Sequence, residues 1–139
     1  MLQIARQGAG PTREGAPENF TGTVQVNAPF VGTAPARVGG ATVTFQPGAR
    51  TAWHSHPLGQ TLVVMSGLGW VQAEGNPVEE IRTGDVIFIP PNVKHWHGAT
   101  DSTAMSHVAM TESLDGKTAD WFGHVADVDY GRGSGIGND

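Results

Sequence analysis

Glycine and proline interrupt this chain so often that only short secondary-structure elements fit between them. Twenty glycines and nine prolines are spread over 139 residues, and the apolar runs that they bound are short, which is typical of strands rather than of a helical bundle. The run 41–45 reads ATVTF, with the alternation of a half-buried strand. Strand and helical patterns do not alternate along the chain. We therefore predict an all-β fold, an antiparallel sandwich or barrel.

The length suits a single domain. Nine strands are expected, over residues 20–27, 38–45, 50–56, 60–66, 69–74, 78–82, 86–90, 95–99 and 103–111. One short C-terminal helix is expected over 117–125, because Asp115 or Gly116 can cap its start and Trp121, Phe122 and Val125 have helical spacing. Residues 1–19 are expected to form an extended arm, 20–126 the barrel, and the glycine-rich 127–139 a flexible tail.

Composition excludes several functions. The chain has no cysteine, so disulfides, thiolate metal sites and a cysteine nucleophile are impossible. Thirteen acidic and eight basic residues give a net charge of −5, which argues against a nucleic-acid partner. No window approaches the 18 apolar residues of a membrane span, and the first twenty residues do not resemble a signal peptide. A cytoplasmic protein with a small-molecule partner is expected.

Two histidine pairs carry the predicted chemistry. His54 and His56 lie two residues apart in an expected strand, so both point to one face, about 6.6–6.8 Å apart. His95 and His97 repeat the spacing after a turn in which Asn92 is expected to have a positive φ. A single histidine usually has a structural role. Two such pairs, each beside a turn in an all-β chain, predict a metal site, because neutral imidazole is a common ligand.

Gln60 follows the turn Pro57-Leu58-Gly59 and can add an amide oxygen beside the first pair. Its alternative role is a hydrogen-bonding neighbour of three histidine ligands. Without an acidic ligand, the double charge of the ion stays uncompensated by the protein, which strengthens it as a Lewis acid. Imidazoles and an amide are compatible with Fe(II), Mn(II), Zn(II), Ni(II) or Co(II).

The spacing of these residues resembles that of the cupins, whose two motifs are G-x5-H-x-H-x3,4-E-x6-G and G-x5-P-x-G-x2-H-x3-N. The first motif is matched by Gly48, His54, His56 and Gly67, with Gln60 in place of Glu. The second is matched by Gly84, Pro90 and His95, with Asn92 in place of Gly and Ala99 in place of Asn. The resemblance covers about residues 20–111. It implies a single-domain double-stranded β-helix (jelly-roll) barrel around one divalent metal ion, with His54, His56, Gln60 and His95 as the ligands.

Shorter strings are similar to those of the bacterial manganese-dependent cupin hydroxynitrile lyases. They are FTGTV at 20–24, PARV at 35–38, PGARTAWH at 47–54, PLGQTL at 57–62, KHWHGA at 94–99, LDGK at 114–117 and DW at 120–121. Glutamine at position 60 agrees with that group. This resemblance implies Mn(II) first and Fe(II) next, and the cleavage or formation of cyanohydrins, as in mandelonitrile to benzaldehyde and HCN.

Such a reaction needs a base beside the substrate hydroxyl, and histidine has a suitable pKa. His107 is the first choice, because the apolar and hydroxyl residues Met105, Ser106 and Val108 around it favour its neutral form. His97 is the second, as the base or as a proton donor to cyanide. For each, the alternative is a structural hydrogen bond. His124 lies outside both segments and is expected at the surface. Residues 41, 43, 45, 62 and 64 share strand faces that could line an apolar pocket or form ordinary core.

Trp53 and Trp96 lie next to the histidines on the opposite strand face, so they are expected to point out of the barrel. Exposed tryptophans need cover, which predicts a homo-oligomer, a dimer or tetramer. Two other functions stay open. One is an Fe(II)-dependent dioxygenase, which would need O2 where a lyase does not. The other is a non-catalytic metal-containing barrel that binds a small molecule, although His97 and His107 are then unexplained.

Overall fold

The computed structural model describes residues 1–6, 8, 10 and 12–135, which contain twelve strands and two short helical segments. The strands are β1 (Arg13–Glu14), β2 (Phe20–Thr21), β3 (Val24–Val31), β4 (Val38–Phe45), β5 (Arg50–Thr51), β6 (His54–Ser55), β7 (Gln60–Ala73), β8 (Glu79–Arg82), β9 (Val86–Ile89), β10 (His95–Ala99), β11 (Met105–Glu112) and β12 (Asp120–Trp121). The helices are α1 (Asp127–Tyr130) and the 3-10 helix η1 (Gly131–Gly135). The all-β prediction is confirmed.

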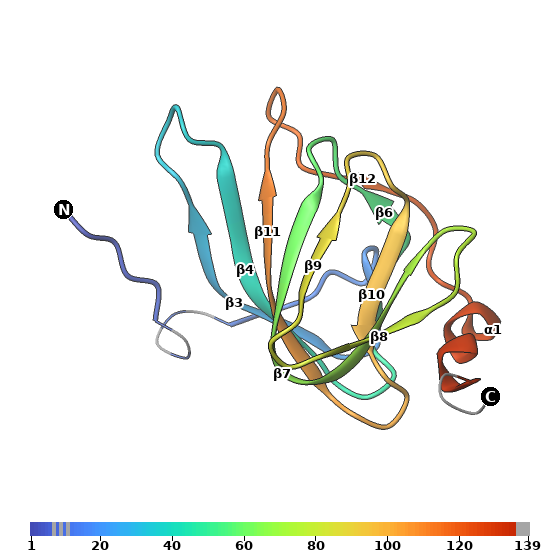
Figure 1. Cartoon of the computed structure of the whole chain (residues 1–139). Coiled ribbons are helices and arrows are strands. Elements are labelled where there is room, and N and C mark those ends of the chain that lie inside the picture. Colours follow the sequence, from blue (N-terminus) through green and yellow to red (C-terminus); the bar gives the residue numbers. More distant parts are fainter. Residues whose placement is uncertain (7, 9, 11, 136–139) are drawn as a thin grey trace.

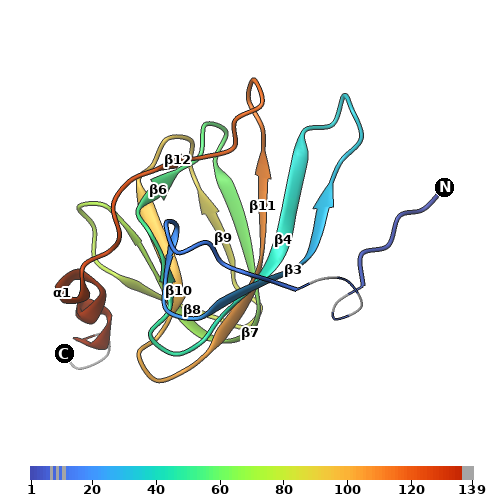
Figure 2. The same cartoon turned by 180° about the vertical axis from the view of Figure 1, so that it is seen from behind.

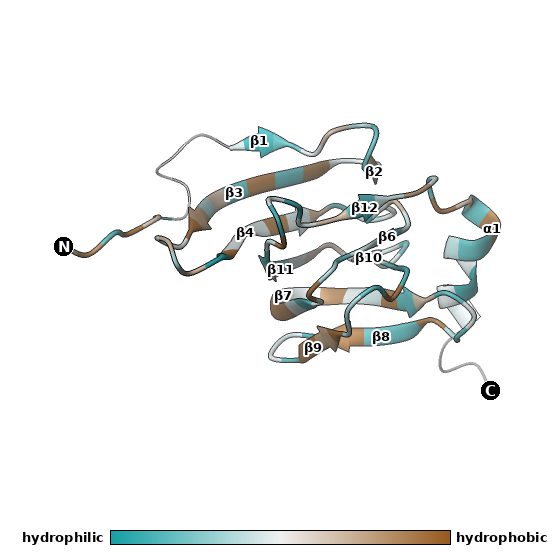
Figure 3. Ribbon diagram, turned by 90° about the horizontal axis from the view of Figure 1, so that it is seen from above, coloured by the Kyte–Doolittle hydropathy of each residue, from teal (hydrophilic) through white to brown (hydrophobic). Residues whose placement is uncertain are grey.

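The long strand β7 belongs to both halves of a curled antiparallel sheet, whose order is β1-β3-β4-β11-β7-β10-β5-β2 (Figures 1 and 2). Its first half pairs with β11 and β9, and its second half with β10 and β8. Gly67 lies where β7 passes between the halves, with φ +80° and no room for a Cβ against the Ala104 carbonyl. From above, β3 and β4 lie on one side and β8 and β9 on the other (Figure 3).

Alternating side chains fill the inside of the curl. Phe45, Leu62, Val64 and Met105 are almost completely buried, and bands of hydrophobic and hydrophilic residues alternate along β3 in Figure 3. Burial of apolar surface of this kind is the main contribution to stability. Of the five residues considered as a pocket lining, Val43, Phe45 and Val64 belong to this core, Leu62 is also buried, and Ala41 is half-buried.

A second hydrophobic cluster lies against the outside of the β10–β7 sheet, and the chain's own C-terminal segment covers it. Trp96 has no exposed surface and packs with Trp70, Val125 and Tyr130. Its indole N–H donates to the side-chain oxygen of Gln72 at 2.8 Å. The expectation that Trp96 is exposed until a second subunit covers it is therefore wrong. Trp53 is half-buried beside the same cluster.

The expected helix over 117–125 is wrong. Asp115 and Gly116 have φ of 52° and 81°, and Leu114 and Lys117 pair across them. Positive φ at both central residues is the signature of a type I′ hairpin turn, for which Asp-Gly is a preferred sequence. The residues that follow form strand β12, and the helix comes later, as α1.

Both ends of the chain contain more secondary structure than the extended arm and flexible tail that were expected. Arg13 and Glu14 add strand β1 to the edge of β3, while residues 1–6 are exposed and extend away from the sheet (Figure 1). At the other end, Tyr130 and Gly133 are buried, with Gly133 against the Trp70 ring. Residues 7, 9, 11 and 136–139 of the expected arm and tail lie outside the described residues. None of the described helices has the length and apolar character that crossing a bilayer requires.

Tyr130 gives a direct test of how the C-terminal segment is attached. Its hydroxyl donates to the Ala99 carbonyl at 2.7 Å, and burial raises its pKa to about 12. Tyr130→Phe should lower the free energy of unfolding by about 1 kcal/mol near pH 8. Between pH 10 and 12 the folded state keeps a proton that the unfolded state loses, so wild-type stability falls as pH rises and its advantage over the variant shrinks.

Denaturant unfolding of both proteins at several pH values tests this prediction. Tyr130 is the chain's one tyrosine, so its ionisation can be followed separately by ultraviolet absorbance. Equal stability of the two proteins near pH 8, or a tyrosine that ionises at its ordinary pKa, would contradict the role assigned to this contact.

Candidate metal centre

The two histidine pairs meet because β6 and β10 are neighbouring strands. His54 and His95 are directly opposite each other in the β6–β10 pairing. The turn before β10 contains Asn92 with φ +64°, as predicted, and the Asn92 N–H donates to the His56 carbonyl at 2.8 Å. The turn that delivers one pair is thus fastened to the backbone of the other.

Three of the imidazoles are oriented by backbone carbonyls. Nδ1 of His54 lies 2.8 Å from the Ala52 oxygen, Nδ1 of His56 lies 2.8 Å from the Thr118 oxygen, and Nδ1 of His95 lies 2.9 Å from the Val93 oxygen. Because a carbonyl only accepts, each Nδ1 carries the proton and each Nε2 presents a lone pair. Metal-binding histidines are commonly oriented in this way.

His97 has a different environment. Its Nδ1 lies 2.9 Å from Nε2 of His107, and its Nε2 lies 3.2 Å from the side-chain oxygen of Gln60. If His97 donates from Nε2 to Gln60, its Nδ1 accepts from His107, and Nδ1 of His107 is left as a buried lone pair with no partner. In the opposite tautomer the Nε2 of His97 is the free lone pair, and His107 carries its proton on Nδ1.

Two ligand sets therefore compete. By proximity, the ligand atoms of His54, His95 and His97 all lie within 4.8 Å of one another, so these three residues could hold a metal ion. The protonation states favour a different set, His54, His56 and His95, because each of these rings has its proton on Nδ1 and a lone pair on Nε2. The Nε2 of His56 is buried with no hydrogen-bond partner, and its ring centroid lies 4.9 Å from that of His54 and 5.4 Å from that of His95.

The donor set fits a divalent cation. The side-chain oxygen of Gln60, an acceptor, lies 3.2 Å from Nε2 of His95. That Nε2 is also an acceptor, because the proton of the His95 ring is on Nδ1. Two acceptors facing each other, together with the unpartnered Nε2 of His56, are unfavourable unless a cation satisfies them. The three-histidine group contains no carboxylate, so the charge of a bound ion would not be compensated by these ligands.

Burial keeps the cluster neutral. It lowers the pKa of His54 and His97 well below the ordinary value, with the neighbouring imidazoles adding to the effect. Burial also lowers the pKa of His95 and of His107 to about 4, and that of His56. Neutral imidazoles are the form that binds metal and accepts protons.

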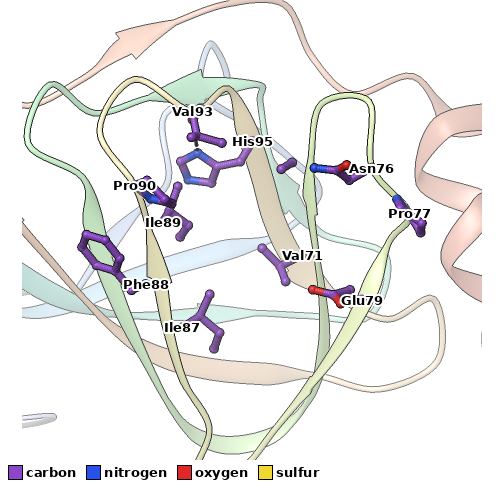
Figure 4. A pocket seen from close by; sticks show the side chains of 11 residues that line it. Val71, Asn76, Pro77, Glu79, Ile87, Phe88, Ile89, Pro90, Val93 and His95 are labelled. Atoms are coloured by element: carbon purple, nitrogen blue, oxygen red, sulfur yellow. Dashed lines mark hydrogen bonds between the residues drawn. The ribbon is translucent and has the colours of Figure 1, made fainter.

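A pocket of about 400 Å³ opens between β8 and β9 and reaches His95 (Figure 4). Its lining is mostly apolar: Val71, Ala73, Pro77, Ile87, Phe88, Ile89, Pro90 and Val93, with Asn76, Glu79 and His95 as the polar members. In Figure 4 the side chains of Val71 and Ile87 face each other across the space, and the His95 ring lies at one end. The pocket therefore offers an apolar compartment next to a candidate ligand.

The structure brings all six sequence-predicted site residues into one buried cluster: His54, His56, Gln60, His95, His97 and His107. His124 is exposed, as expected. Two contributors were missed, the Thr118 carbonyl and the Trp121 ring, which stacks on His54 with centroids 4.6 Å apart. Both were assigned to the helix that does not form. The Asp115-Gly116 turn signal could have revealed them, because a hairpin there returns the chain across the barrel.

Comparison with known proteins agrees with this architecture. Residues 41–111 match the family model of the cupin domain. Over 131 residues, which are 94% of this chain and 100% of the relative, the sequence is 54% identical to a protein named (R)-mandelonitrile lyase from Granulicella tundricola.

Solved structures give the same fold. A cupin-like protein from Thermotoga maritima superposes with a TM-score of 0.81 at 37% identity, covering 94% of this chain and 96% of that one. A predicted oxalate decarboxylase from the same organism has a TM-score of 0.69 at 19% identity, covering 81% and 100%, a likeness of fold alone. These likenesses confirm the expected cupin barrel.

Proposed function

This chain belongs to the cupin family, and we propose that it is a metal-dependent hydroxynitrile lyase that cleaves or forms cyanohydrins such as mandelonitrile. The observation that carries the proposal is a buried, carboxylate-free cluster of five histidines and a glutamine beside an apolar pocket. The (R)-mandelonitrile lyase with 54% identity over its whole length supports the same activity.

We assign the metal ligands to His54, His56, His95 and Gln60. The three imidazoles have their Nδ1 atoms fixed by carbonyls, and the amide oxygen of Gln60 faces the same space as Nε2 of His95. A divalent cation there would supply Lewis acidity, which acidifies the hydroxyl of a bound cyanohydrin. With this ligand set, His97 donates to Gln60 and is free of the metal.

His107 then has the one uncommitted imidazole lone pair of the cluster, on Nδ1, and we assign it as the base. It takes the hydroxyl proton, the O–H electrons form the carbonyl, and the C–CN bond breaks with its electron pair on cyanide. The resulting imidazolium, whose pKa is lowered by burial, is a strong donor and returns the proton to cyanide as HCN. His97 holds His107 in place at 2.9 Å.

The pocket between β8 and β9 is assigned to the organic group of the substrate. Ile87→Trp would fill part of it, so kcat/KM for mandelonitrile should fall about tenfold relative to that for the smaller acetone cyanohydrin. Val86→Trp is the matched control, since Val86 is the exposed neighbour on the same strand. Steady-state kinetics with both substrates test this assignment, and an unchanged preference in Ile87→Trp would refute it.

Anaerobic assay of mandelonitrile cleavage tests the function itself. The lyase proposal predicts that benzaldehyde and HCN form equally with and without O2, and that a chelator abolishes the activity. An Fe(II)-dependent dioxygenase would instead stop under argon, and a non-catalytic binding protein would release no cyanide in either atmosphere.

Three finer predictions stay as predictions. Mn(II) is proposed as the metal, with Fe(II) next, because the sequence resembles the manganese-dependent cupin hydroxynitrile lyases in its local strings and in Gln60. A cytoplasmic location and a dimer or tetramer are also retained. The argument for an oligomer from Trp96 no longer applies, since the C-terminal segment of the same chain covers that residue.

A further inference from the structure

After β11 the chain crosses one end of the barrel as residues 118–127, which we call the strap (Figures 1 and 2). Within it, strand β12 pairs with β6, so that Trp121 is opposite His54 and Asp120 is opposite Ser55. Two further backbone hydrogen bonds flank this pairing: Phe122 N–H to the Trp53 carbonyl at 2.8 Å, and Trp53 N–H to the Gly123 carbonyl at 3.0 Å. The strap is thus a strand added beside the first histidine pair.

The strap touches two of the proposed ligands from outside. The Thr118 carbonyl accepts from Nδ1 of His56 at 2.8 Å. The Trp121 ring stacks on the His54 imidazole, with an interplanar angle of 23°. Trp121 remains 42% exposed, so the strap closes this side of the cluster with a single layer of side chains.

The buried guanidinium of Arg50 holds the C-terminal end of the strap in place. Nη2 of Arg50 donates to the Val125 carbonyl at 2.7 Å and to Asp127 at 2.8 Å. The same guanidinium lies 4.4 Å from the centre of the Tyr130 ring. Because Arg50 is almost fully buried, these contacts position residues 125–127 with little freedom.

We propose that the strap is a working part of the metal centre, and that Trp121 and the Thr118 carbonyl are positioning groups for His54 and His56. Groups that orient metal ligands in this way typically change metal affinity 10- to 100-fold. Coupling of this kind is reciprocal, so metal binding must in turn stabilise the docked strap. The proposal rests on the metal site of the proposed function but not on the reaction.

Metal affinity measured with Mn(II) alone, by calorimetry on the full chain, tests the role of Trp121. Trp121→Ala should raise the Kd by about tenfold or more, whereas Trp121→Phe, which keeps a flat ring against His54, should restore most of the affinity. Phe122→Ala is the matched control, because Phe122 is the exposed neighbour and contacts Lys94 rather than a histidine. Thermal unfolding of the metal-free variants shows whether each is folded.

The proposal is wrong if folded Trp121→Ala binds Mn(II) as tightly as the wild type, or if Phe122→Ala weakens binding equally. Hydrogen exchange on the wild type gives a test without any variant. Mn(II) should slow exchange of the Trp53 and Phe122 amides, but not that of Leu114, which is bonded within the hairpin outside the strap. Equal exchange with and without metal would also overturn the coupling.

These outcomes are distinct from failure of the proposed function. A protein that binds Mn(II) with the strap dependence described here, yet releases no cyanide from mandelonitrile, would refute the lyase and leave the strap's role intact. An active lyase whose metal affinity is unchanged by Trp121→Ala would refute the role of the strap and leave the lyase proposal intact.

Discussion

His56→Ala is expected to remove the metal ion from the protein. With His56 as a ligand, its loss should lower metal affinity by more than about 100-fold, a larger effect than that of a residue that only orients a ligand. Metal content after gel filtration should fall from about one ion per chain to almost none, and lyase activity should fall with it. His97→Ala should keep its metal, because the Nε2 of His97 is assigned as a donor to Gln60.

The comparison of His56 and His97 matters because two criteria select different metal ligands. The distances between ligand atoms favour His97 as the third histidine, whereas the positions of the ring protons favour His56. His97, not His56, belongs to the close group with His54 and His95. Elemental analysis of both variants, each checked for folding by circular dichroism, decides between the two. Loss of metal from His97→Ala with full occupancy in His56→Ala would contradict the ligand assignment.

His107→Ala is expected to lower kcat for mandelonitrile cleavage by at least about tenfold, and by up to about 10⁴-fold if proton transfer limits the rate. Metal content should not change. His107 is completely buried against Phe45, so His107→Gln, which leaves a smaller cavity, separates loss of the base from loss of packing.

His124→Ala is the control for this series, because His124 is exposed and its ring nitrogen lies 3.4 Å from the Thr21 hydroxyl rather than beside a member of the cluster. Initial rates at saturating substrate, with metal content measured on the same samples, give the result. Full activity in metal-loaded His107→Ala or His107→Gln would remove His107 from the mechanism.

The assignment of the metal ligands and the assignment of His107 as the base depend on each other. His97 and His107 are joined by one hydrogen bond, so the proton between them has two positions. If His97 is free of the metal, His107 has a lone pair on Nδ1 and can act as the base. If His97 binds the metal through Nε2, Nδ1 of His107 carries a proton and cannot accept another.

Local patterns predicted an all-β antiparallel sandwich or barrel and a metal site at the two histidine pairs, and the resemblance to the cupins narrowed the fold to the jelly-roll barrel. Strands β4 and β10 have the predicted bounds, because alternation in one and the histidine pair in the other mark their inward faces. The positive φ of Asn92 followed from its place in a tight turn. Spacing of the histidines within each pair also identified the cluster, since residues two apart on a strand share a face.

What local patterns did not reveal depends on contacts between distant residues. Trp121 has helical spacing with Phe122 and Val125, but pairing with His54 places it in a strand. Trp96 reads as an exposed residue until Tyr130, 34 positions later, packs on it. The protonation of His97 depends on His107 and Gln60, which lie on other strands. Such tertiary contacts override local preference.

A crystal structure of the Mn(II)-loaded protein, with anomalous diffraction measured at the manganese edge, tests the central claim most directly. The account predicts one anomalous peak bound by the Nε2 atoms of His54, His56 and His95 and by the side-chain oxygen of Gln60, with His97 turned to Gln60 and His107. A peak held by His54, His95 and His97 without His56, or no peak within the cluster, would contradict it.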